Sequence, residues 1–125
     1  MIAVDSSSWI AYLAGEKGAD VEAVEASLAG SQVCLPPLVL TEILSDSKLP
    51  GQVLSLFRQL PLLVLSEGYW ERAGLLRARI LSHRRKAPLA DTLIAQSCLD
   101  NDVPLITRDP DFQPFARIGG LKLSQ

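Results

Sequence analysis

Four carboxylic acids in this 125-residue chain stand where an apolar run ends or within an expected helix: Asp5, Glu42, Asp91 and Asp109. Carboxylates that share one pocket repel one another, so some stay protonated unless a cation is present. Oxygen ligands of this kind suit Mg²⁺ or Mn²⁺, and the sequence holds no cysteine–histidine cluster that would favour zinc. A divalent ion held there can polarise a phosphodiester and lower the pKa of a bound water. The pattern therefore predicts in-line hydrolysis of a phosphodiester.

The elements that the sequence predicts would place these acids at one edge of a sheet. We expect strands at residues 2–4, 32–35, 62–65, 103–107 and 121–123, and helices at about 9–13, 21–29, 37–45, 53–60, 69–82 and 90–100. The run Ser6-Ser7-Ser8 offers an N-cap for the first helix. Short apolar strands that alternate with amphipathic helices predict an α/β sandwich, with a mostly parallel central sheet flanked by helices. In such a sandwich the amino ends of helices lie at the same edge as the carboxyl ends of strands.

The expected positions of the four acids agree with that edge, although each acid also has a plainer interpretation. Asp5 and Asp109 follow strands and could simply form turns. Asp91 lies in the first turn of its helix and could only complement the helix dipole. Glu42 lies about five residues into its helix, roughly 7–8 Å from the start. It could face solvent, but it interrupts an apolar segment in which an unpaired carboxylate would be costly.

Cations near the acids would be needed to hold the phosphates of a nucleic acid. The candidates that precede the Asp91 helix are Arg77, Arg79, Arg84, Arg85 and Lys86, and weaker ones are Arg108 and Lys122. Contacts of this kind would make binding sensitive to salt, and a solvated helix face is the alternative. The single histidine, His83, could act as an acid or base or have a surface role. Aromatic residues make up only 6% and follow apolar helical stripes, which argues against an aromatic platform for bases.

The composition describes a globular chain with one domain, residues 1–125. Hydrophobic residues make up 48% and charged residues 21%, which excludes a disordered or fibrous chain. The net charge of −2 does not indicate nucleic-acid binding, but bound cations can offset the acids of a nuclease. We expect Cys34 and Cys98 to be buried and reduced. The chain starts without a basic signal region and has no membrane-spanning apolar run, so we expect a soluble cytoplasmic protein.

Four short motifs in the chain resemble those of PIN domains, and within them the VapC-type toxins of bacterial and archaeal toxin–antitoxin pairs. The motifs are IAVDSS at 2–7, LTEIL at 40–44, ADTLIA at 90–95 and LITRDPDF at 105–112. The last two are the most specific, and the resemblance covers essentially the whole chain. It implies a PIN-like α/β/α sandwich. One departure is Lys86-Ala87-Pro88, which stands where relatives often carry glycine and bears on the shape of that loop.

The resemblance also implies an activity: a Mg²⁺- or Mn²⁺-dependent endoribonuclease that is the toxin of a VapBC-type pair. The metal ligands would be Asp5, Glu42, Asp91 and Asp109. Asp111 is a fifth candidate acid, whose alternative role is to cap a short helix beginning near Pro110. The hydroxyls of Ser6 and Thr107 would orient a ligand or its water, or serve as ordinary capping and strand-end groups.

Two protein partners follow from the same resemblance. One is a second copy of the chain in a homodimer. The other is a VapB-type antitoxin, whose C-terminal segment would lie in a groove of the toxin and place a basic residue near the acids. An Arg or Lys placed there could compete with the metal for the same carboxylates.

Other functions share part of the pattern. A PIN nuclease of ordinary RNA processing would use the same chemistry without an antitoxin, and a non-catalytic binding module would not need the acids. A response-regulator receiver wants an acidic pair after its first strand and an aspartate near the middle, whereas here Asp5 stands alone and residues 56–58 read LFR. A haloacid-dehalogenase-like phosphatase wants Asp-x-Asp, and Ser7 occupies the second position.

Overall fold

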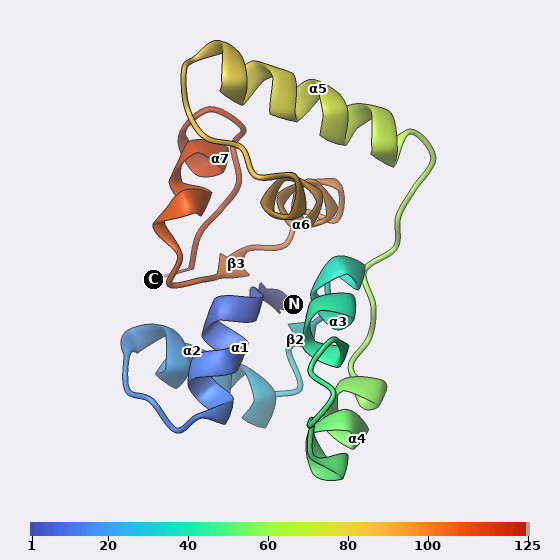
Figure 1. Ribbon diagram of the computed structural model, residues 1–125, viewed down its shortest axis with the longest axis vertical. Coiled ribbons are helices and arrows are strands. Elements are labelled where there is room, and N and C mark those ends of the chain that lie inside the picture. Colours follow the sequence, from blue (N-terminus) through green and yellow to red (C-terminus); the bar gives the residue numbers. More distant parts are fainter. Residues whose placement is uncertain (125) are drawn as a thin grey trace.

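A computed structural model describes residues 1–124 of the chain. The elements in order are β1 (Ile2–Val4), α1 (Ser6–Leu13), α2 (Ala19–Ala29), β2 (Val33–Cys34), α3 (Pro37–Leu44), α4 (Gly51–Gln59), α5 (Tyr69–Ser82), α6 (Leu89–Asp100), β3 (Leu105–Ile106), the 3₁₀ segment η1 (Pro110–Phe112) and α7 (Gln113–Arg117) (Figure 1). The six predicted helices are all present, whereas the five-residue helix α7 was not predicted. Among residues 1–124, no helix is both long and apolar enough to cross a membrane.

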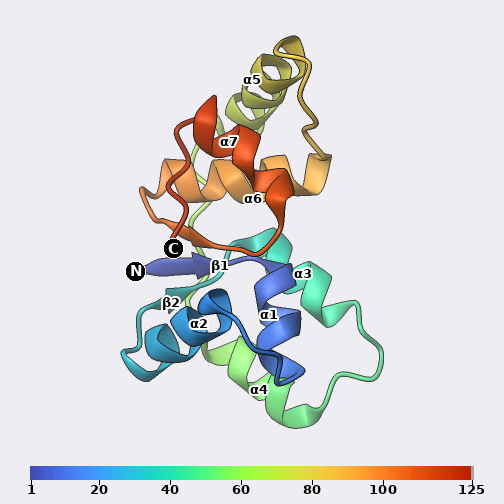
Figure 2. The same cartoon turned by 90° about the vertical axis from the view of Figure 1, so that its left-hand side faces the viewer.

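The three strands form a parallel sheet in the order β2-β1-β3. Ala3 in the central strand faces Cys34 on one side and Leu105 on the other. Helices α5, α6 and α7 lie on one side of the strands, and α1, α2 and α4 lie on the other (Figures 1 and 2). The predicted α/β sandwich with a parallel central sheet is therefore confirmed.

The outer strands expected at 62–65 and 121–123 are reduced to one isolated bridge each, so those two predictions were wrong. Leu35 N–H donates to Pro61 O, and Leu63 N–H donates to Leu35 O. The next bonds of that parallel ladder would need N–H groups from Pro37 and Pro61, which have none. At the other edge only Leu105 pairs with Leu123, because β3 comprises just two residues after Pro104 instead of the expected run from 103 to 107.

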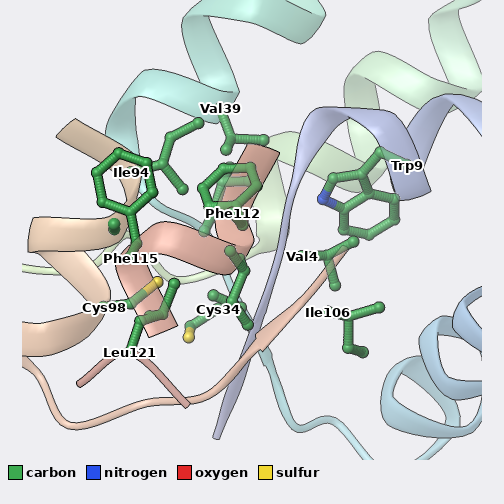
Figure 3. Packing of buried hydrophobic residues seen from close by; sticks show 14 of the residues in the cluster. Val4, Trp9, Cys34, Val39, Ile94, Cys98, Ile106, Phe112, Phe115 and Leu121 are labelled. Carbon is green, nitrogen blue, oxygen red and sulfur yellow. The ribbon is translucent and has the colours of Figure 1, made fainter. Parts of the chain in front are cut away.

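The core lies on both faces of the sheet. Trp9 packs on one face, where its ring centroid is 4.7 Å from that of Phe57. Phe112 and Phe115 fill the other face and belong to η1 and α7 (Figure 3). Cys34 and Cys98 are free and buried as predicted, and burial raises the pKa of the Cys98 thiol to about 12.

Arg72 binds helix α5 to helix α6, its neighbour on the same side of the sheet. Arg72 of α5 donates from Nε to Asp100 Oδ1 at 3.0 Å and from Nη2 to Asp100 Oδ2 at 2.7 Å, and Asp100 ends α6. Its Nη1 donates to the carbonyl of Glu67, just before Gly68. These contacts, called the Arg72 clamp below, fix α5 against α6 and so support the helix that carries Asp91.

Candidate active site

Asp5 directly follows the central strand β1, and hydroxyls bind one of its two carboxylate oxygens. Its Oδ2 accepts hydrogen bonds from Ser7 Oγ at 2.6 Å and from Thr107 Oγ1 at 2.8 Å. The side chain is buried and caps α1 by accepting from Ser7 N–H, so Asp5 and not the serine run supplies the N-cap. In the described part of the chain, every hydrogen bond to this carboxylate falls on Oδ2. Its Oδ1 is therefore the oxygen that can face a ligand.

Three further aspartates from two elements meet beside it. Asp91 in the first turn of α6, Asp109 and Asp111 each offer a carboxylate oxygen, and these oxygens lie within 4.8 Å of one another. The loop after β3 is held by its own bonds, because Asp109 N–H donates to Thr107 Oγ1 and Asp111 N–H donates to Asp109 Oδ1. Asp109, rather than Asp111, is thus the residue that caps the short helix at Pro110.

The electrostatics of Asp91 link all five predicted acids. Its pKa is raised to about 7, first by burial and then by the negative charges of Asp109, Asp5, Asp111 and Glu42. A carboxyl that holds its proton until near neutrality reports a local excess of negative charge. Burial and the charges of four neighbouring acids thus both favour the protonated form of Asp91.

Glu42 lies at the rim of the group. It is exposed on α3, and its Oε1 accepts a hydrogen bond from Ser6 Oγ at 2.5 Å. The buried setting suggested by its apolar neighbours in sequence was wrong, because Ile43 turns inward while Glu42 turns outward. The contact with Ser6 ties Glu42 to the start of α1, next to Asp5.

Each serine of the run after Asp5 donates to a different acid. Ser6 binds Glu42, Ser7 binds Asp5, and Ser8 Oγ donates to Asp20 Oδ2 at 2.8 Å. Sequence reasoning named Ser6 and Thr107 but missed Ser7 and Ser8. Three consecutive hydroxyls directly after a strand-end aspartate were the signal available, but for Ser7 and Ser8 they were interpreted only as a cap.

Two of the predicted cations bind acids: Lys122 pairs with Asp102 at 3.2 Å, and Arg108 binds two acids through its guanidinium. Its Nε donates to Asp20 Oδ2 at 2.8 Å, Nη2 to Asp20 Oδ1 at 3.0 Å, and Nη1 to Glu16 Oε1 at 3.0 Å. Its Nη2 also donates to the carbonyl of Lys17 at 3.3 Å, just before Gly18. These contacts, called the Arg108 clamp below, join the loop of Asp109 to the segment 16–20, which comprises the turn before α2 and the first residues of that helix. The expected phosphate contact would have to compete with them.

The remaining cations lie on or near the loop between α5 and α6. Arg77 Nε donates to the carbonyl of Ala87, and Arg79 donates to the carbonyl of Ile118. The loop itself is exposed, and within residues 1–124 none of its three cations forms an ion pair: Arg84, Arg85 and Lys86. His83 is exposed too, and its Nδ1 lies 2.7 Å from the carbonyl oxygen of Arg79. The basic loop ends at Pro88, the N-cap of the helix that carries Asp91.

The donor set of the site consists of oxygen atoms alone. Hard divalent cations such as Mg²⁺ accept carboxylate oxygens in this way and keep several waters. The close oxygens of Asp91, Asp109 and Asp111, together with the raised pKa of Asp91, therefore fit a divalent cation.

Comparison with known proteins identifies structures of similar fold and a family. In fold, the chain is similar to a chain of VapBC2 from Rickettsia felis bound to a DNA fragment from their promoter (20% identity, TM-score 0.74, covering 99% of this chain and 98% of that one). It is also similar to FitAcB from Neisseria gonorrhoeae (18% identity, TM-score 0.72, covering 100% and 97%). A search of curated protein sequences finds no significant match. The family model of the PIN domain matches residues 2–120, and the chain belongs to the PIN domain family.

Proposed function

We propose that residues 1–125 act as one nuclease domain, a Mg²⁺- or Mn²⁺-dependent endoribonuclease that is the toxin of a VapBC-type pair and cuts RNA in the cytoplasm. The observation that carries this proposal is the meeting of three carboxylate oxygens from Asp91, Asp109 and Asp111 within 4.8 Å. These residues would hold the cation together with Asp5 and Glu42. The PIN family and the two toxin–antitoxin structures of like fold support the same activity.

The protein's own groups prepare the site for hydrolysis. When bound, the cation polarises the phosphodiester and lowers the pKa of a bound water. Ser7 and Thr107 donate hydrogen bonds to Asp5 Oδ2, which fixes the carboxylate and leaves Oδ1 free of protein donors for a cation. Asp91 holds a proton up to about pH 7 when no cation is present, and it releases that proton when it becomes a ligand.

The substrate would enter from the side of the basic loop. Arg84, Arg85 and Lys86 are exposed and lead directly to the helix of Asp91, so they can hold phosphates next to the acids. Binding of RNA should then weaken as salt rises. Arg77 and Arg79 could join them only by leaving the carbonyls they bind at present.

An antitoxin segment would fit the groove beside Glu42. A cavity of about 410 Å³ lies between α1, α3 and the turn before α4, lined on its apolar sides by residues such as Ile10, Leu13 and Val53. Glu42 and Asp46 add negative charge to the same cavity. A peptide with apolar side chains and one Arg or Lys would match it and would occupy Glu42.

A second copy of the chain would cover the apolar surface on α5 and around the start of α6. Trp70 and Leu89 are 67% and 62% exposed there, and with Leu93 they line one hollow. Several large apolar side chains exposed on adjoining elements are typical of an interaction surface.

The test is cleavage of a panel of structured RNAs by purified protein in Mg²⁺ or Mn²⁺, with EDTA and Asp5→Asn as controls. We expect cation-dependent cleavage that leaves 5′-phosphates and is lost in Asp5→Asn. The matched control is Asp102→Asn, which removes an exposed carboxylate paired with Lys122 and should leave cleavage unchanged. Cleavage that survives both EDTA and Asp5→Asn would overturn the proposal.

Two alternatives give different results. A PIN nuclease of RNA processing would cut RNA in the same assay, but its expression without a partner would not arrest growth, whereas an antitoxin-controlled toxin would. A non-catalytic binding module would bind RNA or protein equally well after Asp5→Asn, and it would cut nothing.

A further inference from the structure

We infer that Arg108 is a positioning residue of the acidic site, which sets the affinity for the divalent cation by clamping the loop of Thr107, Asp109 and Asp111 to the segment 16–20. The inference rests on the proposed function, because it concerns the same cation. It assigns to Arg108 a role other than the phosphate contact expected from the sequence.

The contacts of the loop show what the clamp restrains. Thr107 and Asp109 flank Arg108, and both take part in the network around Asp5. Arg108 points instead to Asp20, which it binds through Nε and Nη2 at 2.8 and 3.0 Å. Hydrogen bonds therefore hold this loop on two sides. Thr107 binds Asp5 on one side, and Arg108 binds the segment 16–20 on the other.

Asp20 is itself fixed to the element that follows Asp5. Ser8 Oγ, fully buried in α1, donates to Asp20 Oδ2 at 2.8 Å. A chain of hydrogen bonds thus runs from α1 through Ser8 and Asp20 to Arg108. Asp5 caps the same helix, so the clamp ties Asp109 to the frame that positions Asp5.

A glycine makes room for this arrangement. Gly18 has φ +153°, and a Cβ there would lie 2.6 Å from Asp20 Oδ1 and 3.0 Å from Arg108 Nη2. A side chain at position 18 would push the guanidinium and the carboxylate apart. The close approach of the backbone indicates that the segment is shaped around the arginine.

The alternative is that Arg108 acts only through its charge. Arg108 and Asp109 are neighbours, so a positive charge at 108 would weaken cation binding, and its removal would tighten it. Lysine keeps the charge but lacks the planar fork that binds two carboxylate oxygens. Methionine has neither the charge nor the planar fork. The two substitutions therefore separate position from charge.

The experiment measures Mn²⁺ affinity by titration calorimetry and by electron paramagnetic resonance, without RNA, for wild type, Arg108→Lys and Arg108→Met. The matched controls are Arg72→Lys and Arg72→Met, which break a clamp of the same kind near the far end of α6. Thermal unfolding of the cation-free variants tests whether the Arg108 and Arg72 variants lose similar stability. Cleavage of RNA is measured alongside.

We expect both Arg108 variants to bind Mn²⁺ about 10-fold more weakly, a loss typical of residues that orient metal ligands. Both Arg72 variants should bind Mn²⁺ as wild type does. Gly18→Ala should weaken binding as Arg108→Lys does, whereas Gly68→Ala, whose Cβ would lie 2.6 Å from Arg72 Nη1, should not.

Unchanged affinity in Arg108→Lys would overturn the inference, and so would tighter binding in Arg108→Met, which would assign the effect to charge alone. A loss of affinity in the Arg72 variants equal to that in the Arg108 variants would also overturn it, since the effect would then be general destabilisation. Wild-type protein that binds no Mn²⁺ would reject the proposed function itself, and the inference with it.

Discussion

Arg72 and Arg108 bind their aspartates in nearly the same way, but they hold different parts of the molecule together. Each arginine uses Nε and Nη2 to bind both oxygens of one aspartate, and each also donates to the carbonyl of the residue before a glycine. Those glycines, Gly68 and Gly18, cap α5 and α2 with φ +83° and +153°. The Arg72 clamp joins helix to helix, whereas the Arg108 clamp joins the loop of Asp109 to the start of α2 and the turn before it.

The difference between the clamps concerns what each one positions. Asp100 is nine residues beyond Asp91 on α6, roughly 13 Å along the helix axis, so the Arg72 clamp reaches the acids only through a rigid helix. Arg108 is the immediate neighbour of Asp109. The same bidentate pair therefore serves stability in one region and the geometry of carboxylates in the other.

The largest expected effect compares two aspartates of the same helix. Asp91→Asn should reduce RNA cleavage by at least about 100-fold, because a ligand is lost and not merely misplaced. Asp100→Asn should leave cleavage within about 2-fold but lower the free energy of unfolding by about 1 kcal/mol, because the pair with Arg72 is partly exposed. Initial rates and urea unfolding measure the two effects. Equal losses of activity would contradict the separation of the two regions.

Asp91→Asn should also make the cation-free protein more stable at pH 8. Burial and four neighbouring acids raise the pKa of Asp91 to about 7, while an unfolded aspartate titrates near 3.8. The folded state thus binds the proton more tightly, and stability falls as pH rises from about 4 to about 7. Thermal unfolding in EDTA at pH 5 and pH 8 checks this. A variant less stable than wild type at pH 8 would contradict the charge excess.

Cation binding should have the opposite pH dependence. A cation competes with the proton on Asp91, so Mg²⁺ should raise the melting temperature more at pH 8 than at pH 6. The Arg72 variants should show the same dependence, since their clamp lies apart from the acids. Melting curves with and without Mg²⁺ at both pH values provide the measurement. A pH-independent Mg²⁺ shift would mean that Asp91 is not a ligand.

Removal of one hydroxyl group in each of the two regions should have a smaller effect on the site. Ser7→Ala removes a donor to Asp5 Oδ2 and should weaken Mn²⁺ binding by about 10-fold. Ser66→Ala removes a bond from Arg72 Nη2 to Ser66 Oγ at 3.0 Å and should leave Mn²⁺ binding unchanged. Calorimetric titration compares them. Normal affinity in Ser7→Ala would show that Thr107 alone is enough to orient Asp5.

The features that could be predicted from the sequence are those that depend on the spacing of neighbouring residues. A helix was expected at about 69–82, and in α5 its side chains at helical spacing are buried: Tyr69, Ala73, Leu76 and Ile80. The acids were expected at one edge because parallel strands and helices impose it. The predictions of the outer strands were wrong because hydrophobic periodicity does not show where a backbone N–H group is missing, as it is at Pro37.

The two clamps could not be predicted from the spacing of residues in the sequence. Arg108 and Asp20 are 88 positions apart, and nothing in local spacing pairs one arginine with one of many acids. Arg108 was instead interpreted as a phosphate contact, because a cation beside an acidic motif suits RNA. Only the three-dimensional course of the chain shows that its donors are already occupied.

The smallest expected effect concerns the stability that each clamp contributes and how that stability changes as the pH falls. The hydrogen bonds from Arg108 lower the pKa of Asp20 to about 2, and those from Arg72 lower the pKa of Asp100. A lowered pKa in the folded state adds stability above about pH 4, and this stability is lost as pH falls toward 2. Asp20→Asn should therefore remove about 1 kcal/mol of stability at pH 6 and almost none at pH 2.

Urea unfolding of wild type and Asp20→Asn across this range tests that expectation. Both clamps should contribute to acid stability, but only Asp20→Asn should change Mn²⁺ affinity at pH 8, because only the Arg108 clamp holds a loop of the site. If Asp100→Asn changed Mn²⁺ affinity as much as Asp20→Asn does, the two arginines would form one connected frame. Their separation into a stabilising pair and a positioning pair would then have to be abandoned.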